Sequence, residues 1–391
     1  MHIRSATLAG YRNLTDADLD FSPRVNLVLG RNGEGKTNLL EALNYFALGR
    51  SHRGSRNEDL IAFDGDDLHV RLEVCRNGEI SFTCEYGLNR RGESRLRIDG
   101  EAVVRRTDLV GRLATVFFNP ETTQLVRGGP RYRRQYLDLG RSEIDPVYLQ
   151  DLSAFQRALR QKGTLLRDLR RGVLEPGETR RELVAWNREL ARASATVCLG
   201  RVRETALLNG FVQANHNALL DNDLELILVY RPRLECLQGV TEEKAGNPDF
   251  PGQLEREIAQ ELDYIVEQEI RRGRPLAGPQ FDDLEIGLDG VDLRQFGSQG
   301  ETRTAAIAMT LARSDVLFAT QKVRPVIFFD DIFSELDRER ARRLQEMAAS
   351  LHQVFIATAR PEDVEGWEPR DMRRWRMESG RAVPATVDGM T

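Results

Sequence analysis

Apolar and polar positions follow two different periods along the chain. Residues 25–29 form a short run dominated by apolar residues, as expected of a buried strand. From about residue 68 to 104, alternating runs are separated by Asn-Gly and Asp-Gly turns, which predicts an antiparallel meander. Residues 147–217 carry apolar residues at helical spacing and few Gly or Pro, so we expect long helices there.

Strand–loop–helix patterns occur at both ends of the chain and flank this helical body. We expect further strands at 3–9, 224–230, 326–330 and 353–357, and helices at 38–48, 252–271, 301–319 and 337–350. The pattern predicts an α/β head interrupted by a largely helical lobe. Long coiled coils are not expected, because the helices are too short and their heptad pattern is too irregular. The expected segments are residues 1–146 (first half of the head), 147–271 (helical lobe), 272–384 (second half of the head) and 385–391 (flexible tail).

A glycine-rich segment follows the expected strand 25–29 and opens a helix. Its residues Gly30, Arg31, Asn32, Gly33, Glu34, Gly35, Lys36 and Thr37 fit the pattern G-x-x-x-x-G-K-[ST]. Glycines let the backbone wrap a phosphate, and the helix N-terminus adds partial positive charge. We expect this P-loop to bind ATP, with Lys36 bridging the β- and γ-phosphates and Thr37 ligating Mg²⁺.

A second candidate site follows the apolar run 326–329, where Asp330 and Asp331 stand in sequence. A parallel strand beside the phosphate loop places Asp330 near the metal, and Asp331 can orient and deprotonate the attacking water. Nearly 300 residues separate these carboxylates from Lys36. This gap predicts an insertion between the two halves of one site.

A second Gly-rich turn lies before the helix expected at 301–319. It offers a hydroxyl and backbone amides at a helix N-terminus, which suits either an ordinary N-cap or an anion site. The turn comprises Ser298, Gln299, Gly300 and Glu301.

Composition limits the classes of protein to consider. The net charge is −5, the charged fraction 30% and the hydrophobic fraction 40%, and no stretch approaches a membrane-spanning length. Four cysteines in no metal-binding spacing indicate a reducing compartment, so we expect a cytoplasmic protein without membrane contact. Charge is segregated: residues 127–141 carry +4 and 157–192 carry +5, whereas 221–301 carry −11. A basic face on an acidic protein is consistent with nucleic-acid binding.

Three segments follow one another near the C-terminal end: the Gly-rich turn that begins at Ser298, the strand that ends at Asp330, and the segment Ser334–Asp337. Their order resembles that of the signature turn, Walker B strand and D-loop of ABC-type ATPases. More specifically, the chain resembles the RecF family of SMC/ABC-type DNA-repair ATPases over roughly residues 1–360. The matching segments are 8–14, 30–42, 51–53, 118–138 and 278–284.

The resemblance implies ATP and Mg²⁺ as cofactors and a head-to-head homodimer in which Ser298 reaches the γ-phosphate on the other subunit. It implies binding to gapped DNA, replication maintenance, recombinational repair within the SOS response, and partnership with RecR and RecO in loading RecA. It also implies nucleotide contacts by Arg12 and Asn38 and a metal or water contact by Gln124.

Some positions depart from the family pattern. Gln280 and Phe281 stand where the family usually has His-Arg or His-Lys. Thr358 follows the last core strand in place of the ABC-type switch histidine, and His352 lies before that strand, at the wrong end. A short carboxylate at Asp331 without a histidine partner predicts a weak, DNA-stimulated ATPase that uses ATP mainly as a dimerisation switch.

Two arginine groups are candidates for DNA contact: Arg50, Arg53 and Arg56, and Arg131, Arg133 and Arg134. No aromatic residues interleave with them, which favours salt-sensitive contact with duplex backbone over base stacking.

The alternative functions for the chain are an SMC-like structural head, the ATPase partner of a nuclease and a transporter ATPase. An SMC-like head needs long coiled coils, which this sequence does not predict. A fused nuclease needs a further metal-binding carboxylate cluster, and the sequence shows none. The interrupted head and the missing switch histidine argue against a transporter ATPase.

Overall fold

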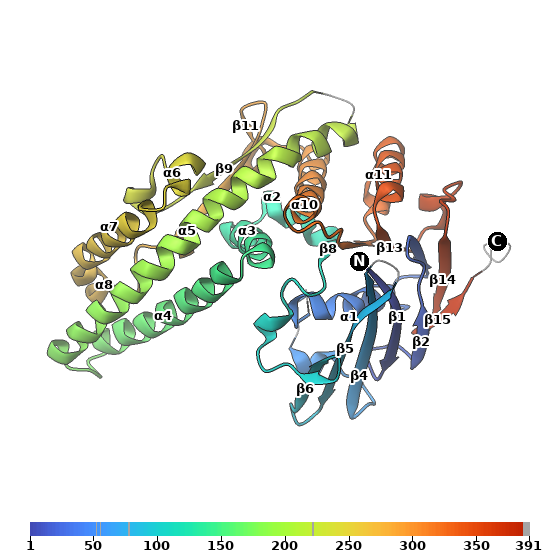
Figure 1. The fold of residues 1–391 in the computed structure, drawn as a ribbon, viewed down its shortest axis with the longest axis horizontal. Coiled ribbons are helices and arrows are strands. Elements are labelled where there is room, and N and C mark those ends of the chain that lie inside the picture. The colour runs from blue at the N-terminus through green and yellow to red at the C-terminus, as the bar shows by residue number, and fades with distance from the viewer. Residues whose placement is uncertain (52, 55, 77–78, 221–222, 386–391) are drawn as a thin grey trace. The chain divides into compact units, whose positions relative to one another are not determined.

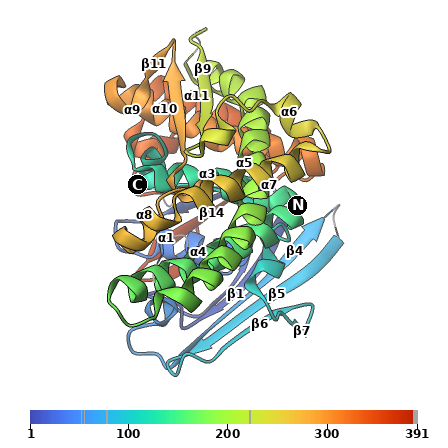
Figure 2. The same ribbon diagram turned by 90° about the vertical axis from the view of Figure 1, so that its left-hand side faces the viewer.

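The computed structural model describes residues 1–51, 53–54, 56–76, 79–220 and 223–385 (Figures 1 and 2). The chain forms two compact units. The sheet unit comprises Met1–Thr122, Ala214–Asn222 and Ala306–Thr391, and the helical unit comprises Thr123–Gln213 and Asp223–Ala305. The tail predicted at 385–391 lies outside the described residues apart from Ala385.

The sheet unit contains a six-stranded, mostly parallel sheet in the order β15-β14-β3-β13-β12-β8. All five residues of β3 and of β12 are buried, which explains their apolar composition. Only β15 runs antiparallel to its neighbour. The strands are β3 (Val25–Leu29), β8 (Thr115–Phe118), β12 (Val326–Asp330), β13 (Gln353–Thr358), β14 (Met372–Glu378) and β15 (Arg381–Pro384).

The register of this sheet brings distant parts of the sequence to one edge. Thr358 pairs with Leu29, and Ala357 pairs with Asp330. The residues after Leu29 and after Asp330 therefore leave the sheet at the same carboxyl end, where ligands of open α/β sheets bind.

A second sheet in the same unit is antiparallel and has the order β2-β1-β4-β5-β6-β7. Its long strands alternate buried and exposed residues, so one face packs on the core. This sheet confirms the predicted meander. Its strands are β1 (His2–Ala9), β2 (Ala17–Asp20), β4 (Asp67–Arg76), β5 (Glu79–Asn89), β6 (Ser94–Ile98) and β7 (Glu101–Ala102).

Helices α1 (Lys36–Leu48) and α11 (Arg338–Ser350) complete the sheet unit, together with the later part of α10 (Gln299–Gln321). Both sheets contribute to one hydrophobic core, in which Phe21, Phe328 and Phe355 are buried. Trp375 packs against Phe21 in this core, as expected of a packing residue.

Helices dominate the second unit, as predicted. They are α2 (Gln124–Arg127), α3 (Pro130–Ile144), α4 (Pro146–Arg170), most of α5 (Pro176–Leu220), α6 (Glu242–Gly246), α7 (Phe250–Tyr264), α8 (Val266–Arg272), α9 (Leu293–Phe296) and the first part of α10. The end of α5, from Ala214 on, belongs to the sheet unit. A small antiparallel sheet accompanies them, with strands β9 (Leu226–Arg231), β10 (Asp283–Leu288) and β11 (Val291–Asp292).

The helical unit has its own core of Leu, Ala and aromatic residues from α4, α5 and α7, including Tyr148, Leu152 and Leu254. A buried ion pair between Lys162 Nζ and Glu269 Oε2, 2.6 Å apart, joins α4 to α8. Burial lowers the pKa of Lys162, and the charge of Glu269 opposes that shift.

The two compact units divide the chain at positions other than the expected 146 and 271. Residues 123–146 and 272–305 belong to the helical unit. Arg133 pairs with Asp283 between these two segments, Asp138 pairs with Arg201 of α5, and β10 pairs with β9. The helix expected at 252–271 is two helices, α7 and α8. No helix in the described part of the chain combines the length and the apolar character that crossing a membrane requires.

Candidate phosphate and metal site

The segment after β3 forms an open loop before α1, as the sequence predicts. Gly33 and Gly35 have φ values of 86° and 104°, a region that residues with a Cβ rarely adopt. A Cβ at Gly30 would lie 2.8 Å from the carbonyl oxygen of Met377, so only glycine fits there. Because Gly35 directly precedes α1, the amides of the loop and of the first helical turn can point toward one bound anion.

Lys36 lies at the first position of α1, and its side chain returns to the loop. Its Nζ donates hydrogen bonds to the carbonyl oxygens of Gly30 at 2.7 Å and Arg31 at 3.0 Å. Burial lowers the pKa of Lys36, while Asp331, Asp330 and Glu34 act in the opposite direction. The ammonium group is therefore held inside the loop, where a phosphate chain would pass.

Thr37 and Asp330 meet at the junction of α1 and β12. The Thr37 hydroxyl donates a hydrogen bond of 3.0 Å to Asp330 Oδ1, which joins the two predicted metal ligands. Burial raises the pKa of Asp330 to about 6, against the hydrogen bond from Thr37 and the charge of Arg53. A cation in the same site would stabilise the charged form of a carboxylate whose pKa is raised by burial.

Asp331 adopts a left-handed backbone conformation, with φ of 54°. Its amide donates to Ala357 O at 2.8 Å, and its carbonyl accepts from the Ser334 hydroxyl at 2.9 Å. Its Oδ1 is buried and has no hydrogen-bond partner among the described residues. The carboxylate is thus held by its backbone and keeps an acceptor free beside Lys36 and Asp330.

Two turns distant in sequence support the phosphate loop. Gly380 N–H donates to Glu34 O at 3.1 Å, and Ser379 N–H donates to the Glu34 carboxylate. Asn13, whose carbonyl oxygen lies against Gly380, donates from its Nδ2 to Gly33 O at 2.8 Å. The sequence analysis did not find this support, because the strands β14 and β15 that carry the Ser379–Gly380 turn were not predicted.

Arg12 forms a two-point ion pair with Glu41 of α1, with distances of 2.5 and 3.0 Å, and the Glu41 side chain is fully buried. Arg12 therefore anchors α1. Its predicted nucleotide contact stays a prediction.

Arg53 is exposed and lies beside the phosphate loop, and its expected DNA contact stays a prediction. Its guanidinium donates to Asn38 Oδ1 at 3.1 Å, and Asn38 Nδ2 donates to Asn13 at 2.7 Å. Because its charge also lowers the pKa of Asp330, Arg53 belongs to the phosphate site. Arg50 and Arg56 are exposed, and their DNA role stays a prediction.

The donor set fits a hard divalent cation with a phosphate chain. Thr37 and Asp330 supply oxygen ligands, and Asp331 has a free buried acceptor nearby. Among the described residues no group of three or more His, Cys, Asp and Glu side chains converges on a metal. Mg²⁺ is typically held by one or two carboxylates together with substrate phosphates, which matches this incomplete set.

The second Gly-rich turn is a reciprocal N-cap of α10. Glu301 N–H donates to Ser298 Oγ at 3.2 Å, and Ser298 N–H donates to Glu301 Oε2 at 2.8 Å, which is a capping box. Ser298 and Gln299 remain exposed, and the neighbouring Phe296 is 72% exposed. The turn is therefore an ordered, accessible surface.

Arg127 supports this turn and was not singled out from the sequence. Its guanidinium donates to Gly297 O at 3.3 Å and to Thr302 Oγ1 at 3.2 Å. Gln124 begins the same short helix, α2, and is exposed; its metal contact stays a prediction.

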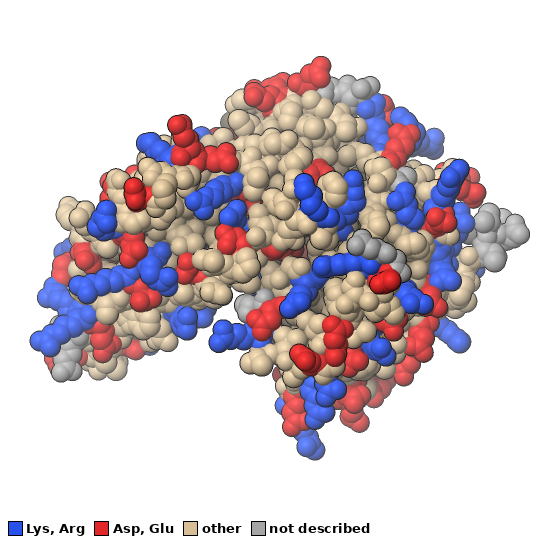
Figure 3. All heavy atoms as spheres, viewed as in Figure 1, with Lys and Arg blue, Asp and Glu red and all other residues tan. Residues whose placement is uncertain are grey.

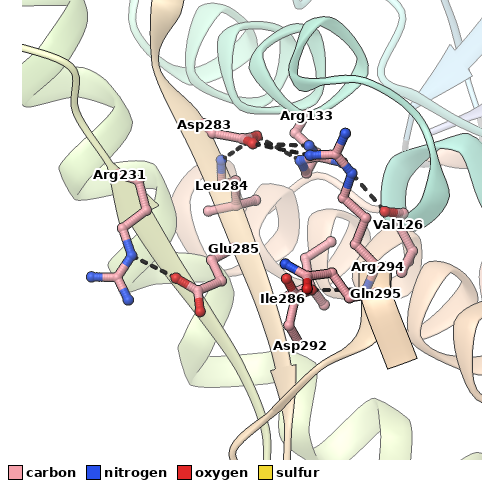
Figure 4. Close-up of a pocket in the computed structure, with 10 residues that line it drawn as sticks. All are labelled: Val126, Arg133, Arg231, Asp283, Leu284, Glu285, Ile286, Asp292, Arg294 and Gln295. Carbon is pink, nitrogen blue, oxygen red and sulfur yellow. Dashed lines mark hydrogen bonds and ion pairs between the residues drawn. The ribbon is translucent and has the colours of Figure 1, made fainter. Parts of the chain in front are cut away.

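Arg133 is buried, which corrects its expected role in DNA binding. It makes two bonds to Asp283, of 2.7 and 3.0 Å (Figure 4). It also donates to Gly128 O at 2.7 Å. The pair forms one wall of a polar pocket of about 400 Å³. Because its donors are engaged inside the protein, Arg133 has a structural role. Arg134 donates to Asp282 O at 2.7 Å, whereas Arg131 is exposed.

His352 precedes β13, at the sheet edge opposite the phosphate loop, and burial lowers its pKa to about 4. This position agrees with its exclusion from the site. Thr358, at the end of β13, donates to Asp363 Oδ2 at 2.7 Å.

The fold and this site define a P-loop protein of the ABC-type head class. The family model of the RecF/RecN/SMC N-terminal domain matches residues 2–378. The protein named DNA replication and repair protein RecF is 33% identical in Symbiobacterium thermophilum, over 98% of both chains. Its counterpart in Staphylococcus carnosus is 31% identical, over 98% of this chain and all of the relative.

Solved structures agree. A structure of the recombination mediator protein RecF-ATP in the RecFOR pathway has a TM-score of 0.86 and 27% identity, with 98% of each chain covered. An Smc head bound to the C-terminal winged-helix domain of ScpA is similar in fold, with a TM-score of 0.56 and 16% identity. The chain therefore belongs to the RecF family.

Proposed function

We propose that this chain is an ATP-dependent DNA-binding protein of recombinational gap repair and replication maintenance. ATP with Mg²⁺ binds at the phosphate loop and drives head-to-head dimerisation on DNA at gaps. Slow, DNA-stimulated hydrolysis resets the protein, which acts with RecR and RecO in loading RecA. The names of the relatives support the repair assignment, and the titles of the solved structures support ATP.

The observation that carries the nucleotide part is the hydrogen bond between Thr37 and Asp330. It joins the end of the phosphate loop to the end of β12, so Thr37 and Asp330 would hold one divalent cation beside the bound phosphate chain. Lys36 would neutralise the phosphate chain, and the loop amides would orient it. Mg²⁺ would supply charge stabilisation at the phosphate being transferred.

The residues at the cleavage point are suited to slow turnover. Asp331 can accept a proton from water through its free Oδ1, and its fixed backbone limits how far the carboxylate can reach. The hydroxyl of Thr358, at the end of the neighbouring strand, is engaged with Asp363 and supplies no base. Hydrolysis then serves to end the ATP-bound, dimeric state on DNA.

Dimerisation is proposed from the accessible signature turn. Ser298 and Gln299 are exposed at the N-terminus of α10, and the capping box already orders them. An ordered, exposed turn at a helix N-terminus would suit the phosphate of a nucleotide held by a second copy. ATP would then stabilise the dimer by binding across the two copies.

The test is light scattering of the purified chain with and without ATP, Mg²⁺ and gapped DNA. Wild type should dimerise with ATP, whereas Lys36→Ala should stay monomeric because it loses the nucleotide. Ser298→Arg should bind ATP and stay monomeric. Ser153→Arg places the same side chain at an exposed serine of α4 and should behave as wild type. Dimerisation of Ser298→Arg at the wild-type ATP concentration would contradict the shared-site proposal.

A further inference from the structure

The helical unit ends in a hollow lined entirely by arginines. It has a volume of about 550 Å³, and the four residues that line it are Arg170, Arg271, Arg272 and Arg274. All four are exposed. Figure 3 shows Lys and Arg side chains gathered over this end of the unit, where the turn between α4 and α5 lies. The hollow is separate from the arginines predicted from the sequence to contact DNA.

The protein holds Arg170 and the helix ends that carry the other arginines in place. Arg170 donates to the carbonyl oxygen of Arg272 at 3.1 Å, so the end of α4 is tied to the end of α8. The stem of Arg170 packs on Gly273, where a Cβ would lie 2.6 Å from Arg170 Cδ. The buried pair Lys162–Glu269 joins the same two helices. The Arg170 side chain and the ends of the two helices are therefore fixed before any ligand arrives.

The charge of the hollow is not neutralised within the unit. None of the four arginines forms an ion pair with any described carboxylate, whereas Arg180 pairs with Glu267 and Arg192 pairs with Asp151 in the same unit. Cations near helix C-termini stabilise the helix dipole, which gives Arg170, Arg271 and Arg272 a reason to stand in the last turns of α4 and α8. Arg274 lies beyond the end of α8, so the dipole gives no reason for it to join the cluster.

The lining distinguishes among classes of ligand. Protein interfaces need apolar or aromatic anchors, and this hollow has none. Base stacking needs aromatic side chains, and none lines it. Guanidinium groups bind phosphate oxygens in a two-point geometry, and several in one place match the repeating charge of a nucleic-acid backbone.

We infer that this arginine hollow is a contact site for the backbone of duplex DNA, on the helical unit and apart from the phosphate loop. The inference rests on the proposed DNA-binding function and assigns part of it to named residues. Contact through phosphates alone is independent of sequence and weakens steeply with salt.

The test measures fluorescence anisotropy of a labelled 40-base-pair duplex with the full chain and ATP, from 50 to 200 mM NaCl. The variant is Arg271→Glu with Arg274→Glu, which leaves the bonded Arg170 and Arg272 in place. The control is Arg188→Glu with Arg256→Glu, two exposed arginines of α5 and α7 outside the hollow, with the same change in charge. The dissociation constant of the hollow variant should rise about tenfold or more at 100 mM NaCl. The slope of log K against log salt should fall by about 2.

The control should stay within about twofold of wild type. Equal binding by the hollow variant and the control would overturn the site. If wild type itself fails to bind the duplex, the proposed DNA function fails and the site fails with it. Binding of a fluorescent ATP analogue reports on the phosphate loop separately. A second variant, Arg271→Gln with Arg274→Gln, adds no negative charge and should also weaken DNA binding. If the Glu variant fails to fold, the Gln variant provides the test, and wild-type affinity in it would overturn the site.

Discussion

The Thr37 hydroxyl and the Asp330 carboxylate are 3.0 Å apart, although 293 residues separate them in the sequence. The hydrogen bond does not fully compensate for the burial of Asp330, whose pKa is raised to about 6. The site therefore carries a charge that the nucleotide-free protein stabilises poorly and that a metal would relieve.

Asp330→Asn should stabilise the nucleotide-free protein at pH 8 but not at pH 4. The pKa of the folded state lies above the ordinary value of 3.8, so folding takes up a proton between these values and the ionised group costs stability above pH 6. Removing the charge should gain on the order of 2 kcal/mol at pH 8. Urea denaturation at both pH values measures the gain, and an equal gain at both would contradict the assignment. The same variant should lose Mg²⁺-dependent binding of ATP.

Gly380→Ala should weaken ATP binding about tenfold. A Cβ at Gly380 would lie 1.8 Å from the carbonyl oxygen of Asn13 and would displace the turn that binds Glu34. Gly366→Ala is the matched control, because Gly366 also has positive φ and an added Cβ there meets open space. Both carry backbone strain of roughly 1 kcal/mol. Titration with a fluorescent ATP analogue separates the two, and equal affinities would show that the turn does not support the loop.

Arg53→Ala should weaken ATP binding severalfold, whereas Arg56→Ala should leave it unchanged. Arg53 contacts Asn38 and lowers the pKa of Asp330, so its loss removes positive charge from the phosphate site. Binding should also become more sensitive to acid, since the pKa of Asp330 would rise further. The nucleotide titration at pH 6 and pH 8 provides the check. An effect on DNA affinity alone would return Arg53 to the DNA-contact group.

Arg133→Ala should destabilise the helical unit by about 2–4 kcal/mol. The change removes the two-point ion pair of Asp283, which keeps a longer pair with Arg294 at 3.8 Å, and the hydrogen bond to the carbonyl of Gly128. Arg131→Ala removes a neighbouring exposed arginine and should change stability by less than about 0.5 kcal/mol. Denaturation followed by circular dichroism makes the comparison. Similar midpoints for both variants would contradict the structural role.

The sequence predicted the phosphate loop, Asp330 and the helical lobe because each has a strong local signal. Val25–Leu29 was predicted to the residue, since an apolar run before a Gly-rich loop leaves little freedom in its boundaries. The strand Met372–Glu378 was missed because charged residues interrupt its apolar positions.

Roles that depend on tertiary contacts were not available from local patterns. Arg133 and Arg131 are two residues apart in an arginine-rich segment, yet one is buried and the other exposed. Only the folded position of Asp283 separates them. Similarly, nothing in the sequence around Arg53 indicates Asn38 as its partner.

The order of strands in the parallel sheet also has a consequence for synthesis of the protein on the ribosome. β3, which leads into the phosphate loop, lies between β13 and β14, and Val25 pairs with Val354 and with Met372. Both neighbours emerge on the order of 300 residues after β3. At ~5–20 residues per second, β3 waits roughly 15–65 s as a nascent strand with neither edge paired. The nascent chain must therefore protect an apolar strand from aggregation for most of translation, and it gains the ability to bind nucleotide only near the end.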